Sequence, residues 1–194
     1  MDLIQSLKEQ AKGLGKKIVL PEFEDSRVIE AAAAILKEGF CVPVLVGAED
    51  KIQAAATAAG VSLEGAEIIN PATFGELNKM VDTFVELRAK KGMTPEKAHA
   101  TMTGDALFFG AMLVRLGLAD GMVAGSASPT ANVLRAAIQV VGTQAGLKTV
   151  SSSMLVITDK KEYGDNGLLI FSDCGVIPNL SLIHISERAG KADR

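Results

Sequence analysis

The chain has 194 residues, of which 48% are hydrophobic and 22% are charged, and its formal net charge is −3. This composition is typical of a soluble globular protein with a sizeable core, and the slightly acidic balance argues against nucleic acid as a partner. The N-terminal segment reads as an amphipathic helix without the apolar stretch of a signal peptide, and no run is long enough to cross a bilayer. We therefore expect a cytoplasmic protein that does not bind membranes.

Strands and helices are predicted to alternate over residues 1–141. Short apolar runs predict strands at 17–20, 42–46, 68–69 and 122–124. Helical patterns with start and stop residues lie at 28–36, 49–59, 74–91, 105–116 and 130–141, and another begins at Pro95 behind the cap Thr94. This alternation predicts an α/β fold with a parallel sheet covered on both faces, and such sheets bind ligands beyond the C-terminal ends of their strands.

The pattern changes from about residue 142 onward. Two apolar runs, 154–157 and 168–172, flank the turn sequence Y-G-D-N-G at 163–167, which predicts a β-hairpin. We predict an N-terminal α/β domain at 1–145 and the opening segment of a second α/β domain at 146–179.

Cysteine and histidine are too sparse for a metal centre. Cys41 and Cys174 are far apart and have no metal-ligand spacing, which favours free thiols in a reducing compartment. His99 stands alone, and His184 lies near the end of the chain. We therefore predict no metal site and no histidine-based catalytic triad.

A loop of small and hydroxyl residues follows the strand at 122–124. It contains Ser126, Ser128 and Thr130 and leads directly into a helix. Backbone N–H groups at a helix start lack intrahelical partners, and the helix dipole favours negative charge there, so the loop is a candidate anion site. The alternative is that Ser128 or Thr130 is an ordinary N-cap.

The helix after this loop carries a narrow polar stripe. Asn132, Arg135 and Gln139 are spaced to share one face, whereas the remaining positions are mostly apolar. A helix that is apolar almost all round is expected to be largely buried, so the stripe is predicted to face a cleft. The alternative is an ordinary exposed helix face.

Arg88 is the second candidate cation. It continues the apolar stripe of Val81 and Phe84, where a guanidinium would need an anionic partner. The alternative is that it reaches solvent at a helix C-terminus beside Lys90 and Lys91, where cations are favoured.

Other charged residues lie at predicted strand ends. Glu22, Glu24 and Asp25 precede Arg27, and we favour a local ion pair over a role for Arg27 in steering ligands. The acidic residues are too close in sequence to make a convincing metal site. Asp173 follows the strand at 168–172, and we favour a turn cap over a catalytic role.

Four motifs in order resemble those of phosphate acetyltransferases, with phosphate butyryltransferases as a close alternative. They are K-I-V-L-P-E-F-E-D-S-R-V-I-E-A-A (17–32), F-V-E-L-R-A-K-K-G (84–92), D-G-M-V-A-G-S-A-S-P-T-A-N-V-L-R-A-A-I-Q (120–139) and E-Y-G-D-N-G-L-L-I-F-S-D-C (162–174). The resemblance implies two α/β domains of the isocitrate and isopropylmalate dehydrogenase type, without nicotinamide.

The resemblance also implies a reaction: reversible acetyl transfer between acetyl-CoA and phosphate, with coenzyme A as a substrate, no cofactor, and a homodimer when full length. It assigns Arg88 and Arg135 to phosphate or CoA binding. With the loop and stripe residues, the predicted substrate-binding set is Arg88, Ser126, Ser128, Thr130, Asn132 and Arg135. A nicotinamide-dependent dehydrogenase is less favoured because no glycine-rich dinucleotide loop is visible. A non-catalytic CoA- or phosphate-binding fragment is a further alternative.

The resemblance stops near Asn179. Residues 180–186, L-S-L-I-H-I-S, look like a translated transposase adapter, so we interpret 180–194 as an artefactual or divergent tail and the chain as truncated. The resemblance implies that the family's catalytic aspartate, serine and third arginine come from beyond this point. We therefore assign no catalytic residue and expect the chain as given to be inactive.

Overall fold

The computed structural model describes residues 3–144, 147 and 150–172. The chain forms two compact units, Met1–Gly142 and Thr143–Arg194, which are considered separately. Asp173, Cys174, His184 and the predicted tail at 180–194 lie outside the described residues.

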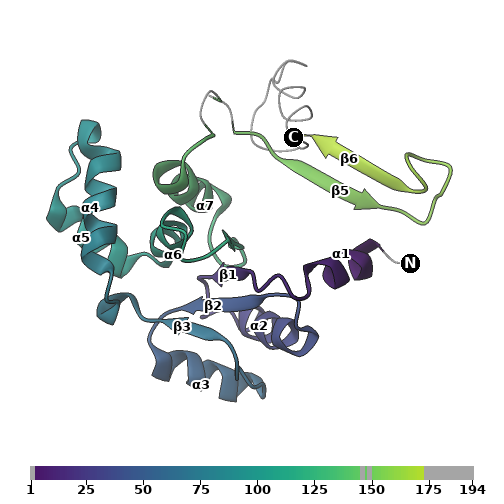
Figure 1. Cartoon of the computed structure of the whole chain (residues 1–194), viewed down its shortest axis with the longest axis horizontal. Coiled ribbons are helices and arrows are strands. Elements are labelled where there is room, and N and C mark those ends of the chain that lie inside the picture. The colour runs from purple at the N-terminus through teal and green to yellow at the C-terminus, as the bar shows by residue number, and fades with distance from the viewer. Residues whose placement is uncertain (1–2, 145–146, 148–149, 173–194) are drawn as a thin grey trace. The chain divides into compact units, whose positions relative to one another are not determined.

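A four-stranded parallel sheet forms the centre of the first unit (Figure 1). Its strands are β1 (Lys17–Leu20), β2 (Val42–Val46), β3 (Glu67–Ile69) and β4 (Gly121–Met122). Their order is β3-β2-β1-β4, and Val19 pairs with Val44 on one side and Met122 on the other. The predicted parallel sheet is confirmed, although β4 ends at Met122, before the expected residue 124. The Val123 N–H still bonds to the Val19 carbonyl oxygen at 2.9 Å, but Val123 is 64% exposed, and the N–H groups of Gly125 and Ser126 bond to Glu22 instead of to β1.

Helices and short helical turns make up most of the rest of this unit. The α-helices are α1 (Leu3–Ala11), α2 (Ser26–Glu38), α3 (Glu49–Ala59), α4 (Leu77–Arg88), α5 (Pro95–Gly104), α6 (Ala106–Arg115) and α7 (Thr130–Ala136). Two 3₁₀ turns, η1 (Pro71–Thr73) and η2 (Ala89–Lys91), flank α4, and a π-helical turn, η3 (Ala137–Val141), extends α7. None of the described helices is long and apolar enough to span a membrane.

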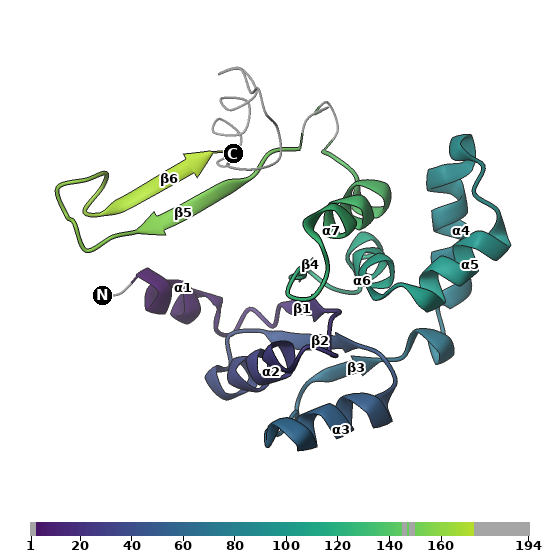
Figure 2. The same cartoon turned by 180° about the vertical axis from the view of Figure 1, so that it is seen from behind.

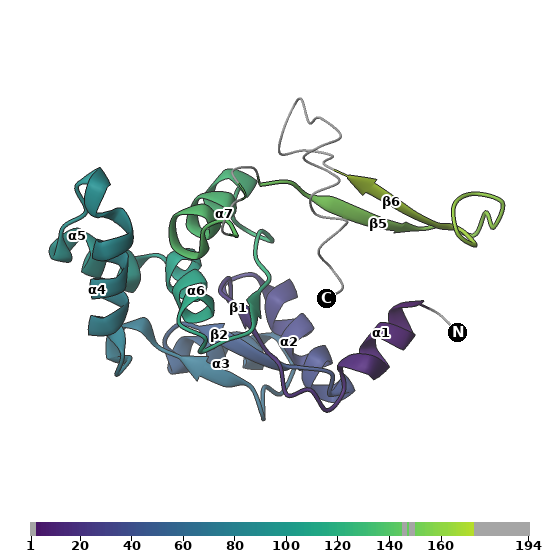
Figure 3. The same ribbon diagram turned by 45° about the horizontal axis from the view of Figure 1, so that its top comes forward.

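The sheet separates two hydrophobic cores, which makes a three-layer sandwich (Figure 2). Successive strand residues point to opposite faces, so Val19 enters one core and Leu20 the other. The first core includes residues of α4, α5, α6 and η3, and the second includes residues of α2 and α3. Figure 3 shows α4 and α5 as a helical pair beside α6. The prediction that helices cover both faces is therefore confirmed.

The strand order reverses between β1 and β4. The chain moves outward from β1 to β2 and β3, then returns to the other side of β1 to form β4. Because parallel strands end at the same edge, the segments that follow β1 and β4 lie side by side there. This switch point is where open α/β sheets bind their ligands.

The described part of the second unit is an antiparallel hairpin. Its strands are β5 (Ser153–Ile157) and β6 (Leu168–Ser172), with Leu155 opposite Ile170. The turn between them includes Asn166 in the left-handed region, with φ of 53°. The predicted hairpin is therefore confirmed.

Candidate functional site

A buried carboxylate occupies the switch point between β1 and β4. Glu22 directly follows β1 and Pro21, and only 7% of its surface is exposed. One carboxylate oxygen, Oε2, accepts hydrogen bonds from the backbone N–H groups of Gly125 and Ser126, at 2.6 and 2.9 Å. The other, Oε1, accepts from the N–H groups of Ala127 and Ser128, at 3.3 and 2.7 Å. The Ser126 hydroxyl adds a longer contact of 3.3 Å to Oε2.

These donors keep Glu22 ionised. Burial alone raises the pKa of the carboxyl group, but hydrogen bonds from the Ser128 side chain and from the backbone N–H groups of Ser126, Gly125 and Ser128 outweigh it. The net effect lowers the pKa from 4.5 to about 2. Glu22 is therefore a fixed negative charge that the protein itself supplies to this loop.

Arg27 holds the same loop from its carbonyl side. Its Nη2 donates to the Ser126 carbonyl oxygen at 2.7 Å and to Asp25 Oδ2 at 2.6 Å. The side-chain hydrogen bond from Arg27 is the main cause that lowers the pKa of Asp25 to about 2. The predicted local ion pair is confirmed, and the same guanidinium also ties the start of α2 to the loop after β4.

The structure changes the interpretation of the predicted anion loop. Ser126 and Ser128 do surround an anion with their backbone N–H groups, but that anion is the chain's own Glu22. Neither Ser128 nor Thr130 is the N-cap of α7, since Pro129 occupies that position and no side chain caps the helix. Thr130 is the exposed first residue of α7.

Asn132 and Arg135 of the polar stripe are exposed, whereas Gln139 lies in η3 and is half-buried. Arg135 Nη1 lies 3.4 Å from Asn132 Oδ1, which confirms that these two side chains share a face. The prediction that the helix is largely buried is wrong: Ala136 and Val140 are buried, whereas Ile138 is 50% exposed. The cause is that α7 and η3 contact the rest of the first unit along one side.

Arg88 is the last residue of α4. It is half-buried, and its Nε is buried without a hydrogen-bond partner among the described residues. Arg88 thus lies on a helix that contacts η3, the continuation of the helix that carries Arg135.

Two contributions were missed by sequence reasoning. The role of Glu22 becomes visible only when the ends of β1 and β4 are brought together, although its place directly after a predicted strand was a usable signal. Arg115, in the last turn of α6, donates to the carbonyl oxygens of Val141 at 2.9 Å and Val140 at 3.4 Å. It thereby supplies partners for carbonyls at the end of η3.

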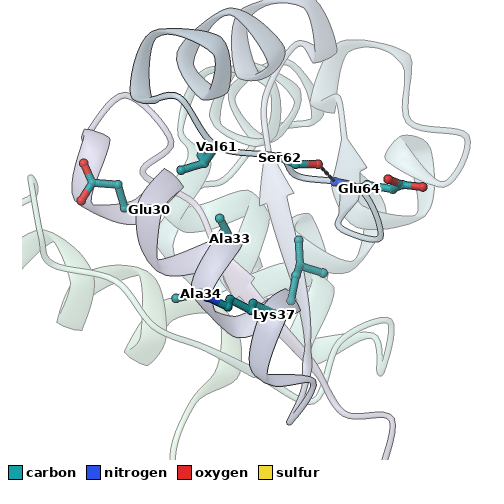
Figure 4. Close-up of a pocket in the computed structure, with 8 residues that line it drawn as sticks. Glu30, Ala33, Ala34, Lys37, Val61, Ser62 and Glu64 are labelled. Atoms are coloured by element: carbon teal, nitrogen blue, oxygen red, sulfur yellow. Dashed lines mark hydrogen bonds between the residues drawn. The ribbon is translucent and has the colours of Figure 1, made fainter.

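A surface hollow of about 560 Å³ lies elsewhere, between α2 and the segment after α3 (Figure 4). Ala33, Ala34 and Lys37 contribute to one side, and Val61 and Ser62 to the other. None of the predicted substrate-binding residues lines it. Over the described ranges, no group of three or more His, Cys, Asp or Glu side chains could hold a metal ion.

Sequence comparison places this architecture among known acyltransferases. The family model described as "Phosphate acetyl/butaryl transferase" matches residues 2–192. A phosphate acetyltransferase of Acetivibrio thermocellus is 41% identical over 194 residues, which cover 100% of this chain and 58% of the relative. One of Thermoanaerobacterium thermosaccharolyticum is 44% identical over 179 residues, 92% of this chain and 54% of the relative. The chain thus spans about half the length of these relatives.

Solved structures agree with the sequence matches. The EutD phosphotransacetylase from Staphylococcus aureus superposes with a TM-score of 0.83 at 36% identity, over 97% of this chain and 55% of that one. A phosphotransacetylase from Streptococcus pyogenes gives a TM-score of 0.85 at 32% identity, over 97% and 56%. Together with the family match across nearly every residue, these results show that the chain belongs to the phosphate acetyl/butyryl transferase family.

Proposed function

We propose that this chain takes part in the reversible transfer of an acetyl group between coenzyme A and inorganic phosphate. Its membership of the family and the names of its relatives support this reaction. Phosphate butyryl transfer is the alternative within the same family. We further propose that the complete enzyme is a cytoplasmic homodimer with the domain arrangement of isocitrate and isopropylmalate dehydrogenases.

The observation that carries the proposal is the unneutralised guanidinium of Arg135. In the described part of the chain it has no carboxylate partner, and its neighbour Asn132 offers only an amide oxygen. Glu22 already satisfies the backbone donors of the adjacent loop, so a phosphate group would be bound mainly by cationic side chains. Guanidinium groups suit this task because their paired N–H donors match phosphate oxygens.

Arg88 supports the same assignment. Among the described residues its buried Nε lacks a partner, and a buried donor of this kind is normally satisfied in the working protein. We propose that Arg88 and Arg135 hold the phosphate or the CoA diphosphate, with Ser126, Ser128, Thr130 and Asn132 lining the approach. Bringing CoA and the phosphorylated substrate together would supply much of the rate enhancement through proximity.

The segment after β1 disfavours the dehydrogenase alternative. A dinucleotide-binding fold places a glycine-rich turn there, so that pyrophosphate can approach the N-terminus of the next helix. Here residues 21–25 contain no glycine, and Glu22 and Asp25 place two carboxylates at that position. We therefore propose that CoA is a substrate and that no nicotinamide is used.

Calorimetric titration of the purified chain with CoA tests the binding assignment. We expect Arg135→Ala and Arg88→Ala each to weaken binding by about tenfold or more, the loss of a charge-assisted hydrogen bond. Lys90→Ala removes an exposed cation near Arg88 and is the matched control. Unchanged affinity in both arginine variants would remove the assignment.

A chimera tests the reaction itself. In it, this chain replaces the matching segment of the Staphylococcus aureus phosphotransacetylase, and thioester formation from acetyl phosphate and CoA is followed by absorbance. Activity that is lost on Arg135→Ala supports the proposal. A folded, CoA-binding chimera that forms no thioester would count against it.

A further inference from the structure

We propose that Glu22 is a positioning residue, a built-in anion that fixes the loop at 125–128 and through it the start of α7, from which Thr130, Asn132 and Arg135 reach the ligand. This inference rests on the proposed function. It extends that function to a residue that would not touch substrate.

The contacts around Glu22 are those of an anion-binding site. Four consecutive residues of the loop direct their backbone N–H groups at its two oxygens, with the shortest contacts at 2.6 and 2.7 Å. Consecutive N–H groups that converge in this way form a concave nest that suits a negative charge. Without the carboxylate, these four N–H groups would lose the acceptor that holds the loop in this conformation.

The loop is joined to the binding residues by a very short path. Ser128 is the last residue that contacts Glu22, Pro129 is the N-cap of α7, and Thr130 is its first residue. The Pro129 carbonyl oxygen also accepts from the Asn132 N–H at 2.9 Å. A displacement of the loop therefore changes where α7 begins and moves Asn132 and Arg135 with it.

Arg27 restrains the same loop with the opposite charge, through a carbonyl oxygen instead of an N–H group. It donates to the Ser126 carbonyl oxygen, while Glu22 accepts from the Ser126 N–H. The same peptide segment is thus held by an anion on its donor side and by a cation on its acceptor side. Glu22 lies just after β1 and Arg27 in the first turn of α2, so the connection from β1 to α2 restrains the loop after β4.

The test combines CoA affinity with amide hydrogen exchange of the intact chain. In Glu22→Ala, we expect CoA to bind about 10- to 100-fold more weakly, and the amides of Gly125, Ser126 and Ser128 to exchange about 10- to 100-fold faster, the range for losing hydrogen bonds to a charged group. Glu24→Ala removes an exposed carboxylate two residues away and should change neither quantity.

Chemical rescue separates positioning from a general loss of structure. Formate is small enough to enter the space left by Glu22→Ala, and we expect excess formate to restore both the slow exchange and the CoA affinity. Chloride at the same ionic strength should not. If Glu22→Ala fails to fold, Glu22→Gln keeps the side-chain volume but turns an NH₂ group toward one pair of loop donors, so that pair alone should exchange faster.

The proposal is overturned if the wild-type chain binds CoA and a folded Glu22 variant binds it equally well with unchanged exchange. Weakened binding that formate does not restore, while the loop amides stay protected, would also overturn it. Absence of CoA binding by the wild-type chain would instead refute the proposed function. In that case the exchange and formate results would still show whether Glu22 holds the loop.

Discussion

Acid should selectively weaken the contact between Glu22 and its loop. The perturbation is Glu22→Gln, which keeps the shape of the side chain but removes its charge at every pH. The carboxyl group has a pKa of about 2 in the folded chain against an ordinary value of 4.5. Since one pKa unit corresponds to about 1.4 kcal/mol, the ionised carboxylate contributes about 3 kcal/mol to the free energy of unfolding.

The sign of the pH dependence follows from the lowered pKa. A group whose pKa falls on folding stabilises the folded state fully at pH values above its unfolded pKa. That stabilisation is lost as the pH falls from 4.5 toward 2. At neutral pH the wild type should therefore be about 3 kcal/mol more stable than Glu22→Gln. The difference should approach zero near pH 2, where the protonated glutamic acid resembles the amide.

Urea unfolding at a series of pH values, followed by far-ultraviolet circular dichroism, measures this difference. The described helices all belong to the first unit, so their signal reports on the part that contains Glu22. Glu24→Gln is the control, because its carboxylate is exposed and an exposed substitution should shift stability by no more than about 0.5 kcal/mol. A Glu22→Gln difference that is independent of pH, or below about 1 kcal/mol at neutral pH, would refute the reasoning.

Three further predictions concern the packing that supports the site, each checked by urea unfolding. Gly110→Ala should destabilise the chain by about 1–3 kcal/mol, because the new Cβ would lie 2.9 Å from Met122 Sδ and 3.0 Å from Val19 Cγ1. Unchanged stability would show that these two side chains can move to make room for the methyl group. Asp105→Ala should lower the free energy of unfolding by about 1 kcal/mol, because it removes the N-cap of α6. Asp105→Asn should keep most of that stability, because its amide oxygen can still cap the helix. Phe109→Ala should cost about 3–5 kcal/mol, since the side chain is fully buried, and a cost below about 1 kcal/mol would contradict that burial.

Elements whose ends are marked by local chemistry could be predicted closely. Helix α2 begins after its N-cap Asp25 and ends at Gly39, which adopts the left-handed conformation. Helix α5 starts at Pro95 behind Thr94, as its sequence indicates. In these cases the interaction that ends the element involves residues within a few positions of one another, so the sequence contains the information directly.

Contacts between distant segments could not be predicted in the same way. Glu22 and Gly125 are separated by 103 positions, and no local pattern shows that a carboxylate after β1 will take the N–H groups of the loop after β4. The small-residue loop predicts an anion beside its N–H groups, and the structure places the chain's own Glu22 there. The identity of that anion depends on which strands become neighbours, and that is decided by the packing of the whole sheet.

The contact between Glu22 and its loop also changes what can be inferred from a small-residue loop beside a helix. Such a loop is often taken as a phosphate site because its backbone donors are free. Here a carboxylate of the chain satisfies those donors, and a second anion at the same N–H groups would be repelled by Glu22. Under the proposed function, an incoming phosphate would be bound by guanidinium groups such as that of Arg135. The contact between Glu22 and the loop donors would fix the position of the α7 backbone that carries Arg135, and the guanidinium group would attract the phosphate.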